Sequence, residues 1–566
     1  MEDIAYLARK FAIRNAMEYG RADEKAVLGK VMGRSKEARE DVEAARRIVG
    51  RVVSEVNGMG KEALESAFAE HAEEFSEFDR QRVERTAKPR MELPGAAKGM
   101  FVTRFPPEPS GYMHLGHAKP AWLEREFADI YEGKVGLYFD DSNPENEKQE
   151  YVDAFKEDLE WLGIKFDREY YASDSIEELY RHAEELISKG GAYVCTCSPA
   201  RIKELRLRGE GCQHKLQHPE DNLSMWKRML GGKMQGSEAV LRLNAVMEDE
   251  NTAMRDPTLF RIKHHRHYRQ GVRFCVWPTY DFNTPVMDSM SGVTDAIRSK
   301  EYELRDKTYY TVLDRLGLRK PRVHSISRLN IKGNITSKRR INALIKEGRI
   351  KGYDDPRLVT IRALRRRGIS PKAIKEFVLK AGMSKAEGEM SLEHLIIENR
   401  GIVDKDALRL FAVEEPVLMH VSKGDASPSL QLHPSRKEAG ARSYKVRSEV
   451  YVSRKDAAEG DVVRLKGLYD ARVLSVDMGK ITAERLEGAK PAKTIQWVPV
   501  GETTYATLQY IGEPFVGDDF NPDSLRDVKV LAENYVSRLS EGDIVQFERI
   551  GYFKLDNKKE MRFLSL

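Results

Sequence analysis

Residues 99–119, GMFVTRFPPEPSGYMHLGHAK, contain the pattern that decides the fold. A short apolar strand is followed by a proline-rich loop with a Ser-Gly turn, and then by the first turn of a helix. His114 and His117 stand three apart on that turn. Imidazoles beside the free backbone N–H groups of a helix N-terminus suit a nucleotide triphosphate. Gly116 would let the adenine or ribose approach the backbone closely.

The alternation of strand and helix continues on the C-terminal side of this segment. Such alternation predicts a parallel sheet with crossover helices, which is a Rossmann-like core. Strand and helix signals return at 292–299 and 307–318, after an interruption that contains a cysteine cluster. The predicted elements are a helix at 121–133, a strand at 135–140, a helix at 151–164 and a strand at 165–172.

A chain of 566 residues is too long for one hydrophobic core, so we expect several domains. The N-terminal residues to about 86 have helical spacing and many charges, and residues 88–98 are a Pro/Gly-rich linker. Short alternating runs near the C-terminus, such as SEVYVS and TIQWVPV, predict antiparallel β-barrels. The predicted multidomain α/β fold has an N-terminal helical extension (1–95), a Rossmann-like domain in two halves (96–194 and 286–335), an inserted domain (195–285), a helical junction (336–412) and a β-barrel region (413–566).

Composition excludes several classes of protein. With 41% hydrophobic and 33% charged residues, the chain is an ordinary globular sequence rather than a disordered or fibrous one. The N-terminal segment lacks a signal-peptide pattern, and no apolar run approaches the roughly 20 residues that cross a bilayer. Four cysteines do not make a disulfide scaffold. We therefore expect a cytoplasmic protein without membrane association.

The segment 104–119 resembles the "HIGH" signature of class I aminoacyl-tRNA synthetases, in the form that glutaminyl and glutamyl enzymes share. His-Leu-Gly-His alone is as typical of a capped helix with two surface histidines. A second segment, ITSKR at 335–339, resembles the mobile "KMSKS" loop of this family. A lone Ser-Lys-Arg is more often a solvated turn, but here it follows the first motif in the expected order. The stretch 339–374 also resembles this group, and the resemblance covers about 97–566.

The resemblance implies that the chain binds ATP with Mg²⁺. It gives the roles of catalytic residues to His114, His117, Ser337 and Lys338. Lys338 would stabilise the charge that develops on the α- and β-phosphates as pyrophosphate leaves. The residues implied to bind ATP are Pro107, Glu108, Gly111, His114, Gly116, His117, Arg328, Leu329 and Lys338.

The amino-acid substrate is implied by a second group of residues. In the family, the acid that matches Asp140 contacts the substrate's α-ammonium, although an arginine usually stands where this chain has Tyr138. The resemblance places Tyr280 and Arg104 at the substrate as well. Arg298 decides between glutamate and glutamine, because glutaminyl enzymes typically carry a small uncharged residue there. A guanidinium offers a bidentate partner to a γ-carboxylate. The alternative for Arg298 is a surface arginine, and Asp295 departs from the family's histidine.

A metal site is predicted from Cys195, Cys197, Cys212 and His214. These form two close ligand pairs, C-x-C and C-x-H, that can surround Zn²⁺ tetrahedrally. The alternative is buried free thiols with an incidental surface histidine. Some glutamyl enzymes carry zinc in this part of the fold, so the resemblance supports a structural zinc. We expect His264, His265 and His267 to be solvated or to face RNA.

An RNA surface is predicted at 319–367, where sixteen lysines and arginines stand against three acids. A charge run is usually a solvated face, but an excess this large is typical of a phosphate-binding surface. The C-terminal region resembles the paired anticodon-binding barrels of glutaminyl and archaeal-type glutamyl enzymes. Arg436, Lys437 and Arg549 are guesses for residues that read bases.

The implied activity is ATP-dependent ligation of L-glutamate to tRNA(Glu) through a glutamyl-adenylate, by an archaeal-type glutamyl enzyme acting as a monomer. The inserted domain would hold the acceptor end of the tRNA, and the junction its inner corner. Four alternatives stay open: a glutaminyl enzyme, an enzyme that also charges tRNA(Gln) with glutamate, a non-catalytic tRNA-binding paralogue and a truncated tRNA-modifying paralogue. Intact His114, His117, Asp140 and Lys338 argue against a non-catalytic paralogue, and the full C-terminal region argues against a truncated one.

Overall fold

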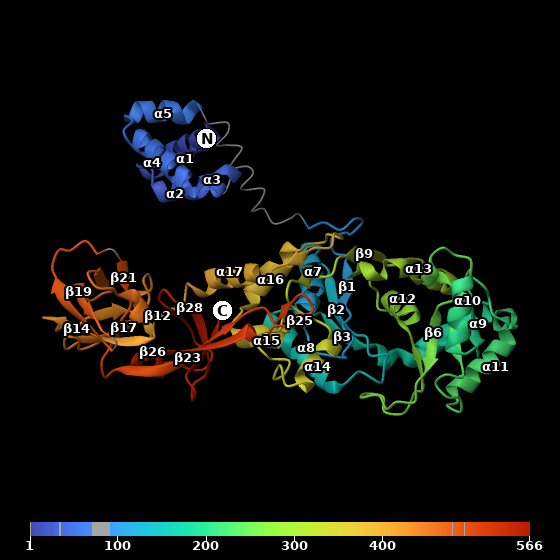
Figure 1. Cartoon of the computed structure of the whole chain (residues 1–566). Helices are drawn as coiled ribbons and strands as arrows, with labels where there is room; N and C mark the ends of the chain where they lie inside the picture. The colour runs from blue at the N-terminus through green and yellow to red at the C-terminus, as the bar shows by residue number, and fades with distance from the viewer. Residues whose placement is uncertain (1, 33–34, 71–90, 478, 492) are drawn as a thin grey trace. The chain divides into compact units, whose positions relative to one another are not determined.

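The computed structural model describes residues 2–32, 35–70, 91–477, 479–491 and 493–566 (Figure 1). The chain divides into two compact units, residues 1–90 and 91–566. The predicted linker at 88–98 spans this division. Its first three residues, and positions 71–86 of the predicted helical extension, lie outside the described residues.

The first unit is a small helical domain with a core of its own, which confirms the predicted helical character of residues 2–32 and 35–70. Alanine and valine side chains dominate that core, so the helices pack closely. The Asn57 side chain forms two hydrogen bonds with the backbone of Ala22. Its amide oxygen accepts from the Ala22 N–H at 2.7 Å, and its amide nitrogen donates to the Ala22 carbonyl at 3.0 Å. The helices are α1 (Glu2–Tyr19), α2 (Glu24–Met32), α3 (Lys36–Glu40), α4 (Val42–Asn57) and α5 (Lys61–Glu70).

The second unit is built around the predicted parallel sheet. Strands β1, β2 and β3 pair in parallel in that order, and β8 pairs in parallel with β9. Thr294 joins the two groups, since its N–H donates to the Val102 carbonyl at 2.8 Å. The Rossmann-like prediction is confirmed. The elements are β1 (Val102–Phe105), α7 (Leu115–Ile130), β2 (Lys134–Phe139), α8 (Gln149–Leu162), β3 (Arg168–Tyr171), β8 (Asp295–Ser299), α13 (Asp306–Leu316) and β9 (Arg322–Ile326).

An antiparallel sheet with its own helices is inserted between these halves. Its strands follow the order β4-β5-β6-β7 and leave the parallel sheet after α9 (Ile176–Ser188). Pro199 and Pro219 occupy the first turns of two helices, where a missing N–H costs nothing. The elements are β4 (Ala192–Cys195), α10 (Pro199–Arg208), α11 (Pro219–Leu230), β5 (Val240–Leu243), β6 (Thr258–Ile262), β7 (Val276–Pro278) and α12 (Tyr280–Met290).

Junction helices follow the parallel sheet and share its core. Ile361, Leu364 and Phe377 pack in one cluster with Phe105 and Phe139 of the sheet. These helices therefore extend the nucleotide fold rather than form a separate body. They are α15 (Ile361–Arg367), α16 (Pro371–Lys380) and α17 (Leu392–Val403), whereas α14 (Lys338–Lys346) packs in a separate cluster with Phe515.

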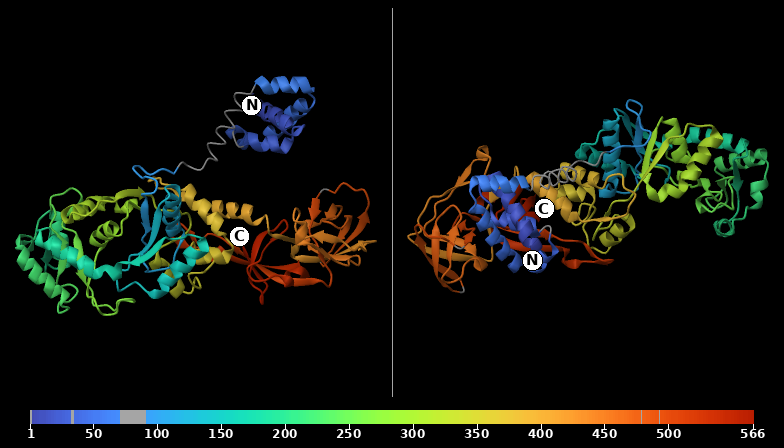
Figure 2. Two further views of the ribbon diagram at one scale, coloured as in Figure 1. Left: turned by 180° about the vertical axis from the view of Figure 1, so that it is seen from behind. Right: turned by 90° about the horizontal axis from the view of Figure 1, so that it is seen from above.

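Two seven-stranded sheets make up the C-terminal region, and Figure 2 shows both from two directions (orange and red). In each sheet, two pairs of neighbouring strands are parallel and the other pairs are antiparallel. The sheets are therefore mixed, whereas the sequence predicts antiparallel strands. The first sheet contains β14 (Pro416–Ser422), β17 (Glu449–Ser453), β18 (Val462–Leu465), β19 (Asp470–Val476), β20 (Lys480–Leu486), β21 (Lys493–Ile495) and β22 (Val498–Pro499). The second contains β12 (Leu408–Leu410), β13 (Ala412–Glu414), β23 (Thr503–Ile511), β26 (Leu525–Glu533), β27 (Ile544–Phe547), β28 (Gly551–Asn557) and β29 (Arg562–Ser565).

Candidate active site

A cavity of about 710 Å³ opens at the carboxyl ends of β1 and β2, beside the start of α7. This is the edge of an open parallel sheet at which ligands bind. Most of the residues that the sequence singles out for ATP or the amino acid line this one cavity. They are Arg104, Pro107, Glu108, His114, Gly116, His117, Asp140, Tyr280, Arg298, Arg328, Leu329 and Ser337.

The two histidines of the first motif form a stacked pair, with ring centroids 3.8 Å apart. His114 caps α7, because its Nδ1 accepts from the Gly116 N–H at 3.0 Å. A Cβ at Gly116 would lie 2.8 Å from the His114 ring. Gly116 is thus needed to seat the histidine, a reason that the sequence does not reveal.

Both imidazoles are neutral at physiological pH. Burial, followed by the charge of Arg328, lowers the pKa of His114 to about 4, and burial lowers the pKa of His117 well below its ordinary value. Since each Nδ1 accepts a backbone N–H, the proton of each ring resides on Nε2. The pair thus offers two N–H donors to an anion in the cavity.

Lys338 lies beside the loop of the first motif rather than among the cavity-lining residues. Its Nζ donates to the Ser110 carbonyl, and a Cβ at Gly111 would lie 3.6 Å from its Cδ. It also stands 4.8 Å from the centroid of the Tyr151 ring. The two motifs, more than 200 residues apart in the chain, are therefore in contact.

Asp140 is held by a relay that starts at Tyr138. The Asn283 amide donates to Asp140 Oδ1 at 2.7 Å, and the Tyr138 hydroxyl donates to the Asn283 carbonyl oxygen at 3.0 Å. Because a carboxylate accepts only, the amide NH₂ must face Asp140 and its oxygen must face Tyr138. Tyr138 and Asn283 are both buried. Burial raises the pKa of Asp140 to about 6.

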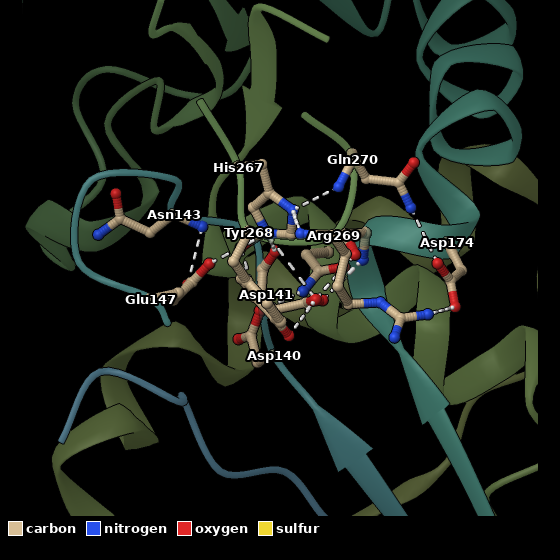
Figure 3. A network of polar contacts seen from close by, with 12 residues as sticks. Asp140, Asp141, Asn143, Glu147, Asp174, His267, Tyr268, Arg269 and Gln270 are labelled. Carbon is tan, nitrogen blue, oxygen red and sulfur yellow. Dashed lines mark hydrogen bonds and ion pairs between the residues drawn. The ribbon is translucent and has the colours of Figure 1, made fainter. Parts of the chain in front are cut away.

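A second network holds the neighbouring Asp141 (Figure 3). Asp141 accepts from the Ser173 N–H and hydroxyl at 2.8 and 2.7 Å and from the Tyr268 hydroxyl at 2.8 Å. His267 lies next to it, with its Nε2 donating to the Asp141 carbonyl at 3.1 Å. The expectation that His267 is solvated or faces RNA is wrong, because only 1% of it is exposed. His264 and His265 are exposed as expected.

Arg298 points into the cavity and is 7% exposed, so it is not a surface arginine. Its NH1 donates to the Tyr280 hydroxyl at 3.1 Å, and its NH2 is paired with Asp306. No described residue accepts from its buried Nε. A guanidinium with an unsatisfied donor in a polar cavity is suited to an anionic ligand.

Arg104 lines the same cavity but already has partners in the protein. Its Nε and NH2 donate to the carboxylate of Asp288 at 2.7 and 3.1 Å, and its NH1 donates to the Ile297 carbonyl at 3.1 Å. A direct contact with the substrate therefore stays a prediction. The bond to Ile297 connects the Arg104–Asp288 pair to β8, the strand that carries Arg298.

Several cavity residues are not found by sequence reasoning. Lys119 is buried in α7 and donates to the Ser327 carbonyl at 2.8 Å, which steadies the segment that carries Arg328. Glu124 is buried on the same helix. The signal that could reveal them is a charged residue beside an apolar neighbour on a largely apolar helix, as in Ala118-Lys119 and Leu123-Glu124.

The predicted metal ligands form a tight cluster at the start of the inserted sheet. The ligand atoms of Cys195, Cys197, Cys212 and His214 all lie within 4.8 Å of one another. The sulfur of Cys197 is 3.5 Å from His214 Nδ1, and Thr196 Oγ1 is 2.8 Å from His214 Nε2. A histidine that binds a metal through one ring nitrogen usually forms a hydrogen bond through the other, which fixes the orientation of the ring. His214 has this arrangement, with Nδ1 toward the thiols and Nε2 toward Thr196.

Part of the basic run at 319–367 is used inside the protein. Arg366 pairs with Asp556 of β28 at 2.9 Å, and the buried Arg367 donates to the Ser565 carbonyl at 3.1 Å. Arg357 forms a buried pair with Asp355 at 2.8 Å. Arg366 and Arg367 thus join the junction helices to the second sheet. The exposed residues of the run remain candidates for phosphate contact: Arg319, Lys320, Arg322, Arg328, Lys332, Arg339, Arg340, Lys346, Arg349, Lys351 and Arg365.

Comparison with known proteins identifies the class to which this site belongs. Residues 100–403 match the family described as tRNA synthetases class I (E and Q), catalytic domain. Residues 407–488 and 494–556 match two anti-codon binding domains of the same group. The first match spans more than half of the chain. The chain belongs to the class I tRNA synthetases of the E and Q group.

Relatives with curated names extend the comparison over the full length. The glutamate–tRNA ligase of Nitrosopumilus maritimus is 37% identical over 99% of this chain and 99% of its own. That of Pyrococcus furiosus is 36% identical over 100% of this chain and 99% of its own. The predicted kinship with archaeal-type glutamyl enzymes is thereby confirmed. A glutamate tRNA ligase structure from Elizabethkingia meningosepticum matches with a TM-score of 0.41 at 18% identity, over 54% of this chain and 70% of that chain.

Hydropathy adds one negative finding. Among the described helices, none is long and apolar enough to span a membrane.

Proposed function

We propose that this chain ligates L-glutamate to tRNA(Glu) through an enzyme-held glutamyl-adenylate. The carrying observation is the buried Arg298 guanidinium, which lines the same cavity as the two histidines and whose NH1 donates to the Tyr280 hydroxyl at 3.1 Å. A γ-carboxylate would give the guanidinium a charged acceptor, whereas a neutral amide would give it only an uncharged one. The names of the full-length relatives support the same substrate.

In the first step, the α-carboxylate of glutamate attacks the α-phosphorus of ATP and pyrophosphate leaves. Asp140 accepts the α-ammonium group, and Arg298 with Tyr280 holds the side chain. The Nε2–H groups of His114 and His117 donate to phosphate oxygens, and Lys338 stabilises the charge that develops on the leaving group. Mg²⁺ bound to the triphosphate neutralises further charge. Positioning and electrostatics suffice, so no protein nucleophile is needed.

In the second step, the 2′-hydroxyl of the terminal adenosine attacks the adenylate carbonyl and AMP leaves. We propose that the inserted domain receives this end of the tRNA and that the two C-terminal sheets contact the anticodon. The exposed basic residues after the second motif would hold the phosphates between them. We also propose that the cysteine–histidine cluster binds a structural zinc ion, with no role in the reaction, in a cytoplasmic enzyme that acts as a monomer.

The deciding experiment charges purified tRNA(Glu) and tRNA(Gln) with radiolabelled glutamate and glutamine in separate reactions. Glutamate on tRNA(Glu), with no glutamine on either tRNA, supports the proposal. Glutamine on tRNA(Gln) would identify a glutaminyl enzyme instead. Glutamate on both tRNAs would widen the proposal to an enzyme that does not discriminate between them. Absence of adenylate formation with tRNA present would overturn catalysis altogether.

The pH dependence of charging follows from Asp140. Only its ionised form attracts an ammonium group, and the pKa of this carboxyl is raised to about 6. Protonation below that pH removes the charge, so kcat/KM for glutamate should fall about tenfold per unit as pH decreases below about 6. Steady-state charging between pH 5 and about 8 measures this limb.

Tyr138→Phe tests whether the hydrogen bonds from Tyr138 to Asn283 and from Asn283 to Asp140 influence the pKa of Asp140, and with it the loss of activity at low pH. The change removes one hydroxyl, frees the Asn283 amide to rotate and weakens its donation to Asp140. Because that hydrogen bond lowers the pKa of Asp140, the acid limb should move to higher pH, with KM for glutamate raised more than kcat. Tyr170→Phe is the matched control, since this ring stacks on Tyr138 at 4.9 Å without touching Asn283. Identical pH profiles in all three proteins would refute the relay.

A further inference from the structure

Arg242 is a buried cation without an obvious partner, in the strand next to the cysteine–histidine cluster. It is 0% exposed, and its NH1 and NH2 have no hydrogen-bond partner among the described residues. Only its Nε is satisfied, by the Asp256 carbonyl at 2.9 Å. Burying an arginine with two unpaired nitrogens is costly, so a compensating charge is expected nearby.

The carboxylate of Asp256, whose backbone carbonyl bonds Arg242, does not supply that charge, because other groups already neutralise it. Asp256 accepts from Lys215 Nζ at 2.8 and 3.0 Å, from the Tyr193 hydroxyl at 2.8 Å and from the Ala245 N–H at 2.7 Å. Lys215 and Asp256 therefore form a balanced pair. Arg242 is therefore left without a counter-charge from this pair.

The strand register places Arg242 on the same face of the sheet as the first thiol. Tyr193 pairs with Arg242 and Cys195 with Val240, and side chains two apart on a strand share a face. The Arg242 guanidinium carbon is 5.7 Å from the centroid of the Tyr193 ring, whose hydroxyl is 3.7 Å from Cys212 Sγ. The guanidinium and the Cys212 thiol thus contact the same tyrosine, and the charge of Arg242 acts on Cys197.

The chemistry of the proposed zinc site provides the missing charge. Three thiolates and one neutral imidazole around Zn²⁺ carry a net charge of −1. One buried guanidinium cancels it, and the balanced pair of Lys215 and Asp256 adds nothing. We infer that Arg242 is the counter-charge of the metal site and positions it for tight zinc binding. The inference rests on the proposed zinc site and is independent of the amino acid that the enzyme uses.

The test measures zinc affinity of the full-length chain by competition with chelators of graded strength, with bound metal read by mass spectrometry. Arg242→Met should weaken zinc binding by about 10- to 100-fold, the range typical of groups that support metal ligands. Arg242→Lys keeps the charge and should retain most of the affinity. Arg315→Met is the matched control: this arginine also bonds backbone carbonyls of the inserted domain, at Gly191 and Asn244.

Each outcome decides the inference. Weak zinc binding in the Met variant together with near-normal binding in the Lys variant supports it. Parental affinity in a folded Met variant overturns it and leaves the zinc site standing. If the Met variant does not fold, the Lys variant alone tests the inference. A loss of zinc affinity in the Lys variant would show that the positive charge at position 242 is not what supports zinc binding, and would overturn the inference. A parental protein without zinc overturns both ideas, while its charging activity would leave the proposed function intact.

Discussion

Replacing Arg298 with cysteine is expected to lower kcat/KM for glutamate by about 10²- to 10³-fold. The γ-carboxylate would enter a buried pocket without its charged partner, and Asp306, which Arg298 now neutralises, would add repulsion. Charging kinetics on tRNA(Glu), with glutamate and glutamine compared, measure the effect. Glutamine should lose far less, because it carries no charge that needs a partner.

Arg315→Cys is a suitable control for this substitution. Arg315 lies on α13, the helix that carries Asp306, and its side chain does not line the cavity. It should leave the ratio of glutamate to glutamine charging unchanged. An unchanged ratio in the Arg298 variant would show that the side chain of the substrate is recognised elsewhere, and Arg104 would then be the first residue to examine.

The second large effect is expected for Lys338→Ala, which should lower kcat for adenylate formation by about 10²- to 10³-fold with KM for glutamate nearly unchanged. The ammonium group acts on charge that develops only as pyrophosphate leaves, so ground-state binding of the amino acid does not need it. Pyrophosphate exchange with saturating tRNA measures the step. Lys372→Ala, an exposed lysine on α16, is the control. A rise in KM without loss of kcat would contradict this role.

The sequence predicts those features that depend on neighbours along the chain. The parallel sheet follows from alternating apolar strands and amphipathic helices, and the start of a helix at the two histidines follows from the proline-rich loop and Ser-Gly turn before them. The cluster of Cys195, Cys197, Cys212 and His214 is equally local, because each ligand pair spans a single intervening residue. Arg298 lines the cavity, and its contact with the substrate stays a prediction drawn from the family resemblance.

Features that depend on distant partners were not predictable. His267 is buried only because Asp141, more than 100 residues earlier, offers it a carbonyl. Tyr138 acts through Asn283, which no spacing rule connects to it. A charge count cannot tell an arginine that pairs across a domain junction, as Arg366 does with Asp556, from one that faces solvent. Such pairings are set by tertiary packing, which overrides local pattern.

The strand order of the C-terminal region has a consequence for biosynthesis. Leu408 of β12 pairs with Val545 of β27, whereas the parallel sheet is complete at Ile326. During translation the nucleotide-binding half has all its strands while the ribosome is still making the last third of the protein, and β12 must wait for a partner. A nascent chain stalled near position 500 would thus expose an unpaired strand edge, and chaperones that cover such edges should be recruited at that stage.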